Sequence, residues 1–155
     1  MSDTIAQRLA EQGIILSVPP MPLASYVGYV QHGDLVFISG QLPMVDGELA
    51  SAGLLGGDLS IEDGVAAARI CGINVLNQVN AACDGDLERV KCCVRLGVFV
   101  ASAPDFTSQP QVANGVSDLI GSIFGEKGAH ARAAVGVASL PINASVEVEA
   151  IFAIS

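Results

Sequence analysis

Several residue types are scarce in this chain of 155 residues, and each scarcity excludes a class of protein. Tryptophan is absent, aromatic residues make up 5% of the sequence and charged residues 15%, where a soluble domain usually has about a quarter of its residues charged. Hydrophobic residues make up 51% and the mean hydropathy is +0.54. No apolar run approaches the length of about 18 residues that a membrane span needs. We therefore expect no membrane span and a single domain large enough to build a core.

Basic residues are also few. Seven lysines and arginines stand against 16 acidic residues, the formal net charge is -9, and the longest basic cluster is Arg89-Val90-Lys91. Nucleic-acid binding needs a basic stripe that neutralises phosphates, and binding to an anionic membrane surface needs a polybasic segment. The composition therefore predicts neither a nucleic-acid partner nor a membrane partner.

The cysteines form no Cys-x-x-Cys pair, and the N-terminus lacks the apolar stretch of a secretion signal. The four cysteines are Cys71, Cys83, Cys92 and Cys93. This pattern favours reduced thiols in a cytoplasmic protein. Cys93 would share a strand face with Lys91 and Arg95, cations that could lower its pKa, so it is a candidate for a reactive thiol. Neither His32 nor His130 has a partner at metal-ligand spacing, so we expect no metal site.

Turn and capping signals divide the chain into segments. Residues 3–12 are predicted to form a short helix, and the Pro-rich residues 18–22 separate it from the remainder. A second helix is expected over residues 60–82, because Ser60 and Asp63 form a capping box. The apolar periodicity of residues 109–124 predicts a third.

Strands are expected at residues 25–31 and 35–39, around a tight turn at His32-Gly33-Asp34. A longer strand is predicted over residues 91–101, and two alternating runs follow the last helix. Alternation in the 91–101 strand predicts one common face for Cys92, Val94, Leu96, Val98 and Val100. The two final runs flank a short break at residues 140–143, a pattern typical of a hairpin.

This order of elements predicts an α+β fold, with one mixed sheet and two helices packed on one of its faces. The chain has no further large element to cover the opposite sheet face, so we expect a neighbouring subunit to cover it. Residues 1–17 are interpreted as an N-terminal helical extension, and residues 18–155 as the domain.

The two final runs carry the charges of greatest chemical interest. Because successive side chains alternate across a strand, Glu147 and Glu149 share one face of the last run, and Arg132 shares a face of the preceding run with Ala134. Paired as a hairpin, the runs would place one guanidinium and two carboxylates on a surface of small residues. We interpret this surface as the floor of a pocket for a small anionic ligand. An ion pair between Arg132 and one of the glutamates is the alternative, and alternation alone does not distinguish Glu147 from Glu149.

Four motifs together resemble the Rid family of reactive-intermediate deaminases, also called the YjgF family. They are Ser39-Gly40-Gln41-Leu42-Pro43, the strand that begins near Arg132, Leu140-Pro141, and Val146-Glu147-Val148-Glu149-Ala150. The match covers roughly residues 20–155. The resemblance implies a chorismate-mutase-like domain and a homotrimer with clefts between its subunits.

The resemblance also implies roles for individual residues. Arg132 matches the family arginine that holds the substrate carboxylate, a task for which a planar guanidinium is suited. Glu147 matches the glutamate that positions or activates water. Tyr26 matches a tyrosine at the edge of the cleft, and Asn114 resembles an asparagine of the last helix.

Three further positions complete the site that the resemblance implies. Ser39 and Gly40 would supply hydroxyl and backbone contacts, and the glycine would allow close approach of a ligand. Many family members carry a cysteine two residues after the arginine. Ala134 occupies that position here, which excludes a thiol and leaves a backbone N–H role.

The function that the resemblance implies is hydrolysis of small 2-imino or enamine acids to 2-keto acids and ammonia in an intersubunit cleft. A non-catalytic trimeric binding module for a small carboxylate metabolite is the alternative, and it would use the same arginine. A third activity attached to parts of the family, endoribonuclease or translation inhibitor, is disfavoured by the acidic charge. No G-x-G-x-x-G or P-loop motif occurs, so we expect no cofactor.

Overall fold

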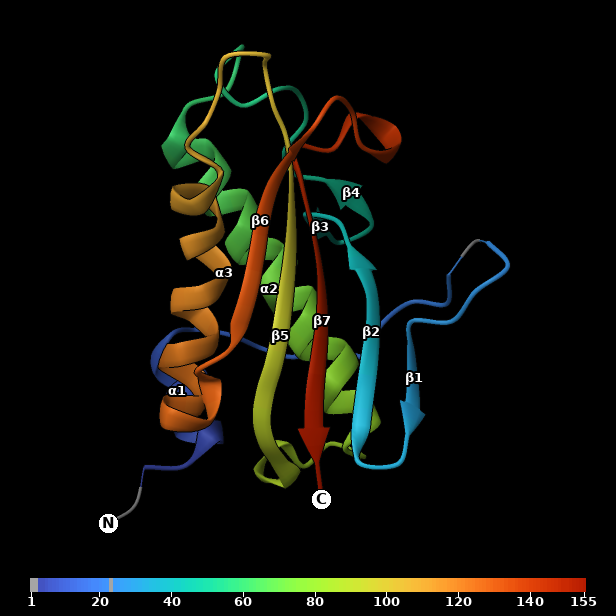
Figure 1. The fold of residues 1–155 in the computed structure, drawn as a ribbon. Helices are drawn as coiled ribbons and strands as arrows, with labels where there is room; N and C mark the ends of the chain where they lie inside the picture. The colour runs from blue at the N-terminus through green and yellow to red at the C-terminus, as the bar shows by residue number, and fades with distance from the viewer. Residues whose placement is uncertain (1–2, 23) are drawn as a thin grey trace.

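The structure is a computed structural model that describes residues 3–22 and 24–155. Five strands form one sheet in the order β1-β2-β7-β5-β6, and β3 and β4 form a separate short ladder. The strands are β1 (Tyr29–His32), β2 (Leu35–Gln41), β3 (Met44–Val45), β4 (Glu48–Leu49), β5 (Val90–Ala101), β6 (Ala131–Val137) and β7 (Val146–Ile154). The helices are α1 (Ile5–Glu11), α2 (Ile61–Ala82) and α3 (Gln109–Phe124). Figure 1 shows α2 crossing behind the sheet and α3 alongside it, with no helix in front.

Capping and periodicity explain where the helices begin. The Ser60 hydroxyl accepts a hydrogen bond from the Asp63 amide at 3.1 Å, and the Asp63 carboxylate accepts one from the Ser60 amide at 2.9 Å. These bonds hold the pKa of Asp63 below its usual value. Helix α3 begins with Gln109-Pro110, where proline is tolerated because the first helical N–H has no partner. The three expected helices are confirmed. The expectation that two helices form the layer on one side of the sheet is corrected to three, because α1 packs against α3.

Helices α2 and α3 approach closely through glycine. A Cβ atom on Gly115 of α3 would collide with the backbone carbonyl of Val65 and lie 3.1 Å from the Cβ of Ala68. A Cβ atom on Gly72 of α2 would lie 2.9 Å from side-chain atoms of Val116 and Leu119. Each helix therefore leaves a gap that the other helix fills.

The predicted terminal hairpin is wrong. Strands β6 and β7 do not pair, because β5 lies between them, parallel to β6 and antiparallel to β7. The connection from β6 to β7 contains a 3-10 turn at Pro141–Asn143, in which Ile142 and Asn143 both adopt positive φ. This turn carries the chain across the end of β5 instead of folding it back on β6.

The new strand order separates the charges that the hairpin would have joined. Leu96 of β5 pairs with Arg132 on one side and with Ala150 on the other. Paired residues point to the same side of a sheet, so Arg132 lies on the helix-facing side with the buried Leu96 and Ala150. Glu147 and Glu149 alternate with buried residues along β7 and lie on the opposite, outer face. The expected common floor for Arg132 and the glutamates is therefore wrong within one chain.

The predicted single face for alternate residues of the 91–101 strand is also wrong at its beginning. The register of β5 against β7 shifts between Val90 and Cys92 and again between Cys93 and Arg95, as β-bulges do. As a result Cys93 is buried opposite Phe152, and Val94 is exposed. Cys93 and Arg95 therefore lie on opposite faces, so the expected shared face is wrong. Burial also raises the pKa of Cys93 to about 12, which disfavours a reactive thiol.

The outer face of the sheet carries large apolar side chains in contact with solvent. Val30 of β1 is 54% exposed, Phe37 of β2 44% and Val135 of β6 46%. The register places all three on the side of Glu147 and Ile151, away from the helices. Within the described ranges, none of the helices combines the length and apolar character needed to cross a bilayer.

Candidate functional site

Arg132 is held by the helix beside its strand. Its Nη1 donates hydrogen bonds to the side-chain oxygen of Asn114 at 2.8 Å and to the Ser117 hydroxyl at 3.1 Å. Its Nη2 donates to the Pro110 carbonyl at 3.4 Å. A guanidinium has five N–H donors, so Nε–H and one N–H of Nη2 have no partner among residues 3–22 and 24–155.

The charge of Arg132 has no counterion within the chain as described. No Asp or Glu of residues 3–22 and 24–155 lies within ion-pair distance of Arg132, whereas Arg8, Arg89, Lys91 and Arg95 each have such a partner. The side chain is exposed on edge strand β6. A fixed and uncompensated guanidinium with two adjacent N–H donors can bind a carboxylate in bidentate fashion.

Glu147 forms the second part of the candidate site, on the outer sheet face. A Cβ atom on Gly40 of the neighbouring strand β2 would collide with the Glu147 carboxylate. The glycine of the Ser39-Gly40-Gln41 motif therefore makes room for this side chain. Glu147 is half-buried, and burial together with the nearby charge of Glu149 raises the pKa of the Glu147 carboxyl.

The structure distinguishes the two glutamates that strand alternation left equivalent. The Glu149 carboxylate accepts a hydrogen bond from Nη1 of Arg95 at 3.1 Å, which compensates its charge. Glu147 has no such cation among the residues placed in the structure. Of the two carboxylates, that of Glu149 is therefore engaged in an ion pair and that of Glu147 is not, among those residues.

Ser39 lies on the same sheet face as Glu147 and is bonded to the segment that follows Tyr26. The Ser39 hydroxyl donates to the Val27 carbonyl at 2.6 Å, and its amide donates to the Gly28 carbonyl at 2.9 Å. Ser39 thus fixes the segment that carries Tyr26, whose side chain is 57% exposed. A cavity of about 340 Å³ opens on this face, between Ser39 and Glu149.

The predicted site residues therefore form two groups on opposite faces of the sheet. Asn114 and Ala134 accompany Arg132 on the helix side, with Ala134 packed against the core. Ser39 and Gly40 accompany Glu147 on the outer side. One chain does not bring the two groups together.

Sequence reasoning missed Ser117 and His130. Ser117 follows Asn114 by three residues, so the two share a helix face. His130 lies just before β6 and precedes Arg132 by two residues, the spacing at which extended residues share a face. These spacings were visible in the sequence. Their meaning depends on the packing of α3 beside β6, which no local pattern predicts.

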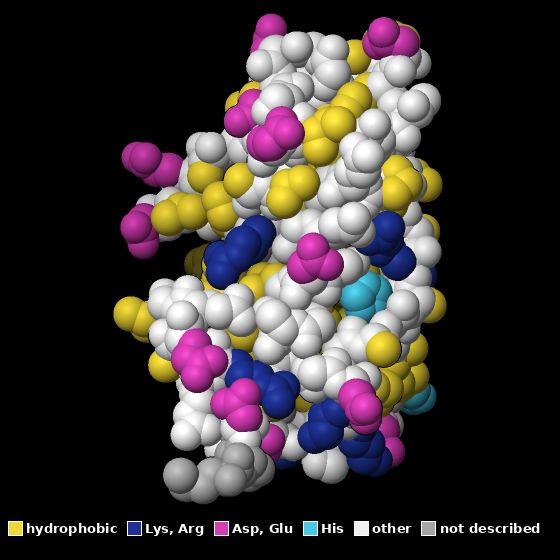
Figure 2. Space-filling view, turned by 90° about the vertical axis from the view of Figure 1, so that its left-hand side faces the viewer, with side chains coloured by type: hydrophobic (Ala, Val, Ile, Leu, Met, Phe, Trp, Pro, Cys, Tyr) yellow, Lys and Arg dark blue, Asp and Glu magenta, His cyan; other side chains and the backbone are white. Residues whose placement is uncertain are grey.

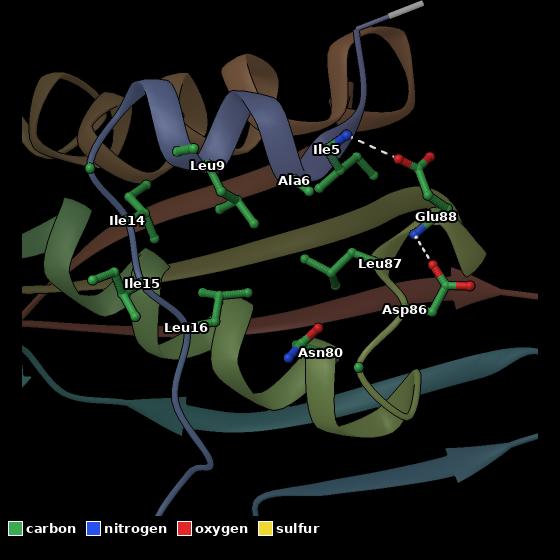
Figure 3. Close-up of a pocket in the computed structure, with 13 residues that line it drawn as sticks. Ile5, Ala6, Leu9, Ile14, Ile15, Leu16, Asn80, Asp86, Leu87 and Glu88 are labelled. Carbon is green, nitrogen blue, oxygen red and sulfur yellow. Dashed lines mark hydrogen bonds between the residues drawn. The ribbon is translucent and has the colours of Figure 1, made fainter.

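A more spacious cavity than the one beside Ser39 lies elsewhere. It measures about 640 Å³ and lies between α1 and the end of α2, lined mainly by aliphatic side chains such as Leu9 and Ile14 (Figure 3). The Glu88 carboxylate, at one end of it, accepts a hydrogen bond from the Ile5 amide at 3.0 Å. None of the predicted site residues lines this cavity. Nor do three or more His, Cys, Asp or Glu side chains of the described residues form a group that could hold a metal ion.

Comparison with known proteins connects this arrangement to a family. The family model "YjgF/chorismate_mutase-like, putative endoribonuclease" matches residues 6–154. Protein TCP17 of Trypanosoma cruzi is 50% identical over 151 residues, which cover 97% of this chain and 94% of that protein. A 2-iminobutanoate/2-iminopropanoate deaminase of Dermatophagoides farinae is 28% identical over 142 residues, covering 90% and 95%.

Solved structures share the fold. Protein Atu1372 of Agrobacterium tumefaciens superposes with a TM-score of 0.92 at 48% identity, covering 97% of this chain and 92% of that one. TdcF of E. coli, solved with bound serine, has a TM-score of 0.61 at 26% identity, covering 89% and 94%. With its mixed sheet and one-sided helix layer, the chain belongs to the YjgF/Rid family and has the chorismate-mutase-like fold of that family.

Proposed function

We propose that this protein hydrolyses small 2-imino or enamine acids to 2-keto acids and ammonia, in a cleft between the subunits of a homotrimer. The observation that carries the proposal is the Arg132 guanidinium, which is fixed by α3, lacks a counterion among the described residues and keeps donors free. Two relatives support the choice of ligand. One is an iminobutanoate deaminase, and the other was solved with serine, a small carboxylate.

Assembly is part of the proposal because Arg132 and Glu147 lie on opposite faces of the sheet. A small ligand cannot contact both side chains of one chain. Arg132 is on edge strand β6, where it is accessible to a neighbouring copy, and the outer face that carries Glu147 exposes Phe37 and Val135. Packing of that apolar face against a neighbour would remove these side chains from water and bring a second copy close to Glu147.

The chemistry requires only water and proton transfer. In the proposed reaction Arg132 binds the substrate carboxylate, and Glu147 takes a proton from a water molecule whose oxygen bonds to the imine carbon. Transfer of protons to the nitrogen then allows the C–N bond to break, which releases ammonia and leaves the keto acid. One water is consumed and nothing is oxidised or reduced. The pKa of the Glu147 carboxyl is raised and so lies closer to neutral pH than that of an ordinary glutamate. A general acid or base is most effective when its pKa lies near the operating pH.

Two other functions remain alternatives. A binding module for a carboxylate metabolite would use Arg132 in the same way, without turnover. An endoribonuclease would need a surface that attracts phosphates, but on the α3 side of the molecule the basic side chains lie apart from one another and among acidic ones (Figure 2). The net charge of -9 also disfavours RNA.

A direct assay tests the proposal. The protein is added to freshly generated 2-iminobutanoate, and formation of 2-oxobutanoate is compared with the spontaneous rate for wild type, Arg132→Ala and Glu147→Gln. We expect acceleration by wild type and a large loss in both variants. Binding of 2-oxobutanoate without acceleration would instead establish the binding module. Cleavage of RNA at physiological salt would establish the nuclease.

A further inference from the structure

A chain of hydrogen bonds leads from Arg132 to a histidine outside the predicted site. Nη1 of Arg132 donates to the Ser117 hydroxyl oxygen at 3.1 Å, and this oxygen lies 2.9 Å from Nε2 of His130. Nδ1 of His130 lies 2.6 Å from the backbone carbonyl oxygen of Gly128. Ser117 and His130 are both half-buried, whereas Arg132 is exposed.

When the His130 imidazole is neutral, the chemistry of the end groups sets the direction of each bond in this chain. A carbonyl oxygen only accepts hydrogen bonds, so Nδ1 of His130 must carry the proton shared with Gly128. In a neutral imidazole Nε2 is then an acceptor, and the Ser117 O–H donates to it. The Ser117 hydrogen is thereby directed away from Arg132, and an oxygen lone pair is left to accept from Nη1.

We propose that Ser117 and His130 are positioning residues that orient Arg132 for its ligand. With both hydrogens of Nη1 engaged by Asn114 and Ser117, the guanidinium cannot rotate without losing bonds. The edge formed by Nε and Nη2 is therefore presented to the carboxylate. The effect on substrate rests on the proposed function, whereas the effect on the guanidinium itself does not.

His130 is needed in this arrangement because the hydroxyl of a serine in a helix can also bond to the helix backbone. Without an acceptor at Nε2, the Ser117 hydroxyl can turn to the backbone carbonyl four residues earlier in α3, as serine side chains in helices do. Its lone pairs then point elsewhere, and the bond from Arg132 weakens. Asn114 still holds Nη1 at 2.8 Å, so the orientation is loosened rather than lost.

Four variants test the proposal on the full-length protein. Ser117→Ala removes the hydroxyl that joins Arg132 to His130. His130→Phe keeps an aromatic ring but removes the Nε2 acceptor, and His130→Gln supplies an amide oxygen as the acceptor instead. Ser122→Ala is the matched control, because Ser122 lies on the same helix but contacts Gln12 and the Leu119 carbonyl instead.

We expect Ser117→Ala and His130→Phe to weaken 2-oxobutanoate binding about threefold to tenfold, the loss typical of one hydrogen bond. The change should appear in KM for 2-iminobutanoate rather than in kcat, because the carboxylate is bound equally in ground and transition states. His130→Gln should recover most of the affinity, and Ser122→Ala should match wild type.

Nuclear magnetic resonance of the ¹⁵N-labelled protein provides a readout that needs no substrate. Wild type should show His130 with its proton on Nδ1, together with slow rotation of the Arg132 Nη groups. Rotation should be faster in Ser117→Ala and His130→Phe. A proton on Nε2 of His130, or unchanged Arg132 rotation in both variants, overturns the proposal even if the enzyme is active. If wild type neither binds 2-oxobutanoate nor hydrolyses imines, the proposed function fails while the rotation data still decide the roles of Ser117 and His130.

Discussion

The environment of Arg132 comes from a neighbouring helix rather than from its own strand. Asn114, Ser117 and the Pro110 carbonyl all belong to α3. If Arg132 anchors a carboxylate, Arg132→Ala should weaken 2-oxobutanoate binding by at least about tenfold, because a desolvated charge pair is typically worth about 2–5 kcal/mol. Arg132→Lys should give an intermediate loss, since it keeps the charge without the planar fork. Calorimetry measures both, and sedimentation of each variant should show an unchanged assembly. Unchanged affinity with a dissociated assembly would make Arg132 a structural residue.

The raised pKa of Glu147 makes a prediction about stability. The folded state holds the Glu147 proton more tightly than the unfolded state, so between the two pKa values the folded state binds more protons. The free energy of unfolding therefore falls as pH rises through this window. Glu147→Gln does not titrate, so we expect it to be more stable than wild type at neutral pH, with a difference that disappears below about pH 4. Urea unfolding at several pH values and one protein concentration measures this. A difference that grew on acidification would mean that the folded protein stabilises the charged form.

The absence of a thiol at position 134 leads to a third prediction. Among the cysteines, Cys71, Cys83 and Cys93 are buried and Cys92 is half-exposed, and burial raises the pKa of Cys71 and of Cys93. Mild alkylation should therefore modify Cys92 first and leave deaminase activity in place. Mass spectrometry locates the modification, and the imine assay measures the activity. Complete loss of activity with modification at Cys93 alone would show that this thiol takes part in the chemistry.

At the scale of elements, the contact between α2 and α3 depends on Gly115. Gly115→Ala would drive a Cβ atom into the Val65 carbonyl, and overpacking of this kind typically costs about 1–3 kcal/mol. Gly121 of the same helix has nothing within 4 Å of an added Cβ atom. Gly121→Ala should therefore stabilise the protein by about 0.5–1 kcal/mol, through helix propensity alone. Equal effects of the two substitutions in urea unfolding would refute the close approach.

Local signals predicted the elements well and their pairing poorly. The capping box at Ser60 and the apolar periodicity of residues 109–124 act within one helix, so α2 and α3 were predicted nearly residue by residue. Strand β5 enters between β6 and β7 from a distant part of the chain. Alternation and a short connection are equally compatible with a hairpin and with this crossover. The bulges of β5 likewise have no local signal, and they reversed the expected faces of Cys92 and Val94.

Prediction of the candidate site was also limited by the lack of local signals for strand pairing. The sequence placed Arg132 and Glu147 correctly on strands, and the family resemblance named Asn114, which the structure brings to Arg132. Which sheet face each charge occupies depends on strand order, and strand order depends on long-range pairing. Ser117 and His130 were not predicted as site residues, because their hydrogen bonds to Arg132 and to each other form only when α3 packs beside β6.

At the scale of the whole molecule, the uncovered sheet face predicts assembly. Sedimentation at micromolar concentration should show a species near three times the chain mass of 15.8 kDa. Phe37→Glu places a charge on the outer face, where burial in an interface is costly, and should dissociate the assembly. Ile15→Glu is the control, because Ile15 is 91% exposed beside α1 on the helix side. A monomeric wild type, or equal behaviour of the two variants, would contradict both the interface and the intersubunit cleft.

Strand β7 follows every other strand in chain order, yet it lies at the centre of the sheet between β2 and β5. Until the ribosome has released β7, β2 and β5 have no common partner, and α2 has little sheet surface to cover. The pairing of Leu35 with Ala153 joins segments from distant parts of the chain, a topology that folds slowly compared with local contacts. During synthesis the nascent chain therefore exposes the edges of β2 and β5, which are the surfaces that favour aggregation. We therefore expect the edges of β2 and β5 to stay open to non-native pairing until β7 is available.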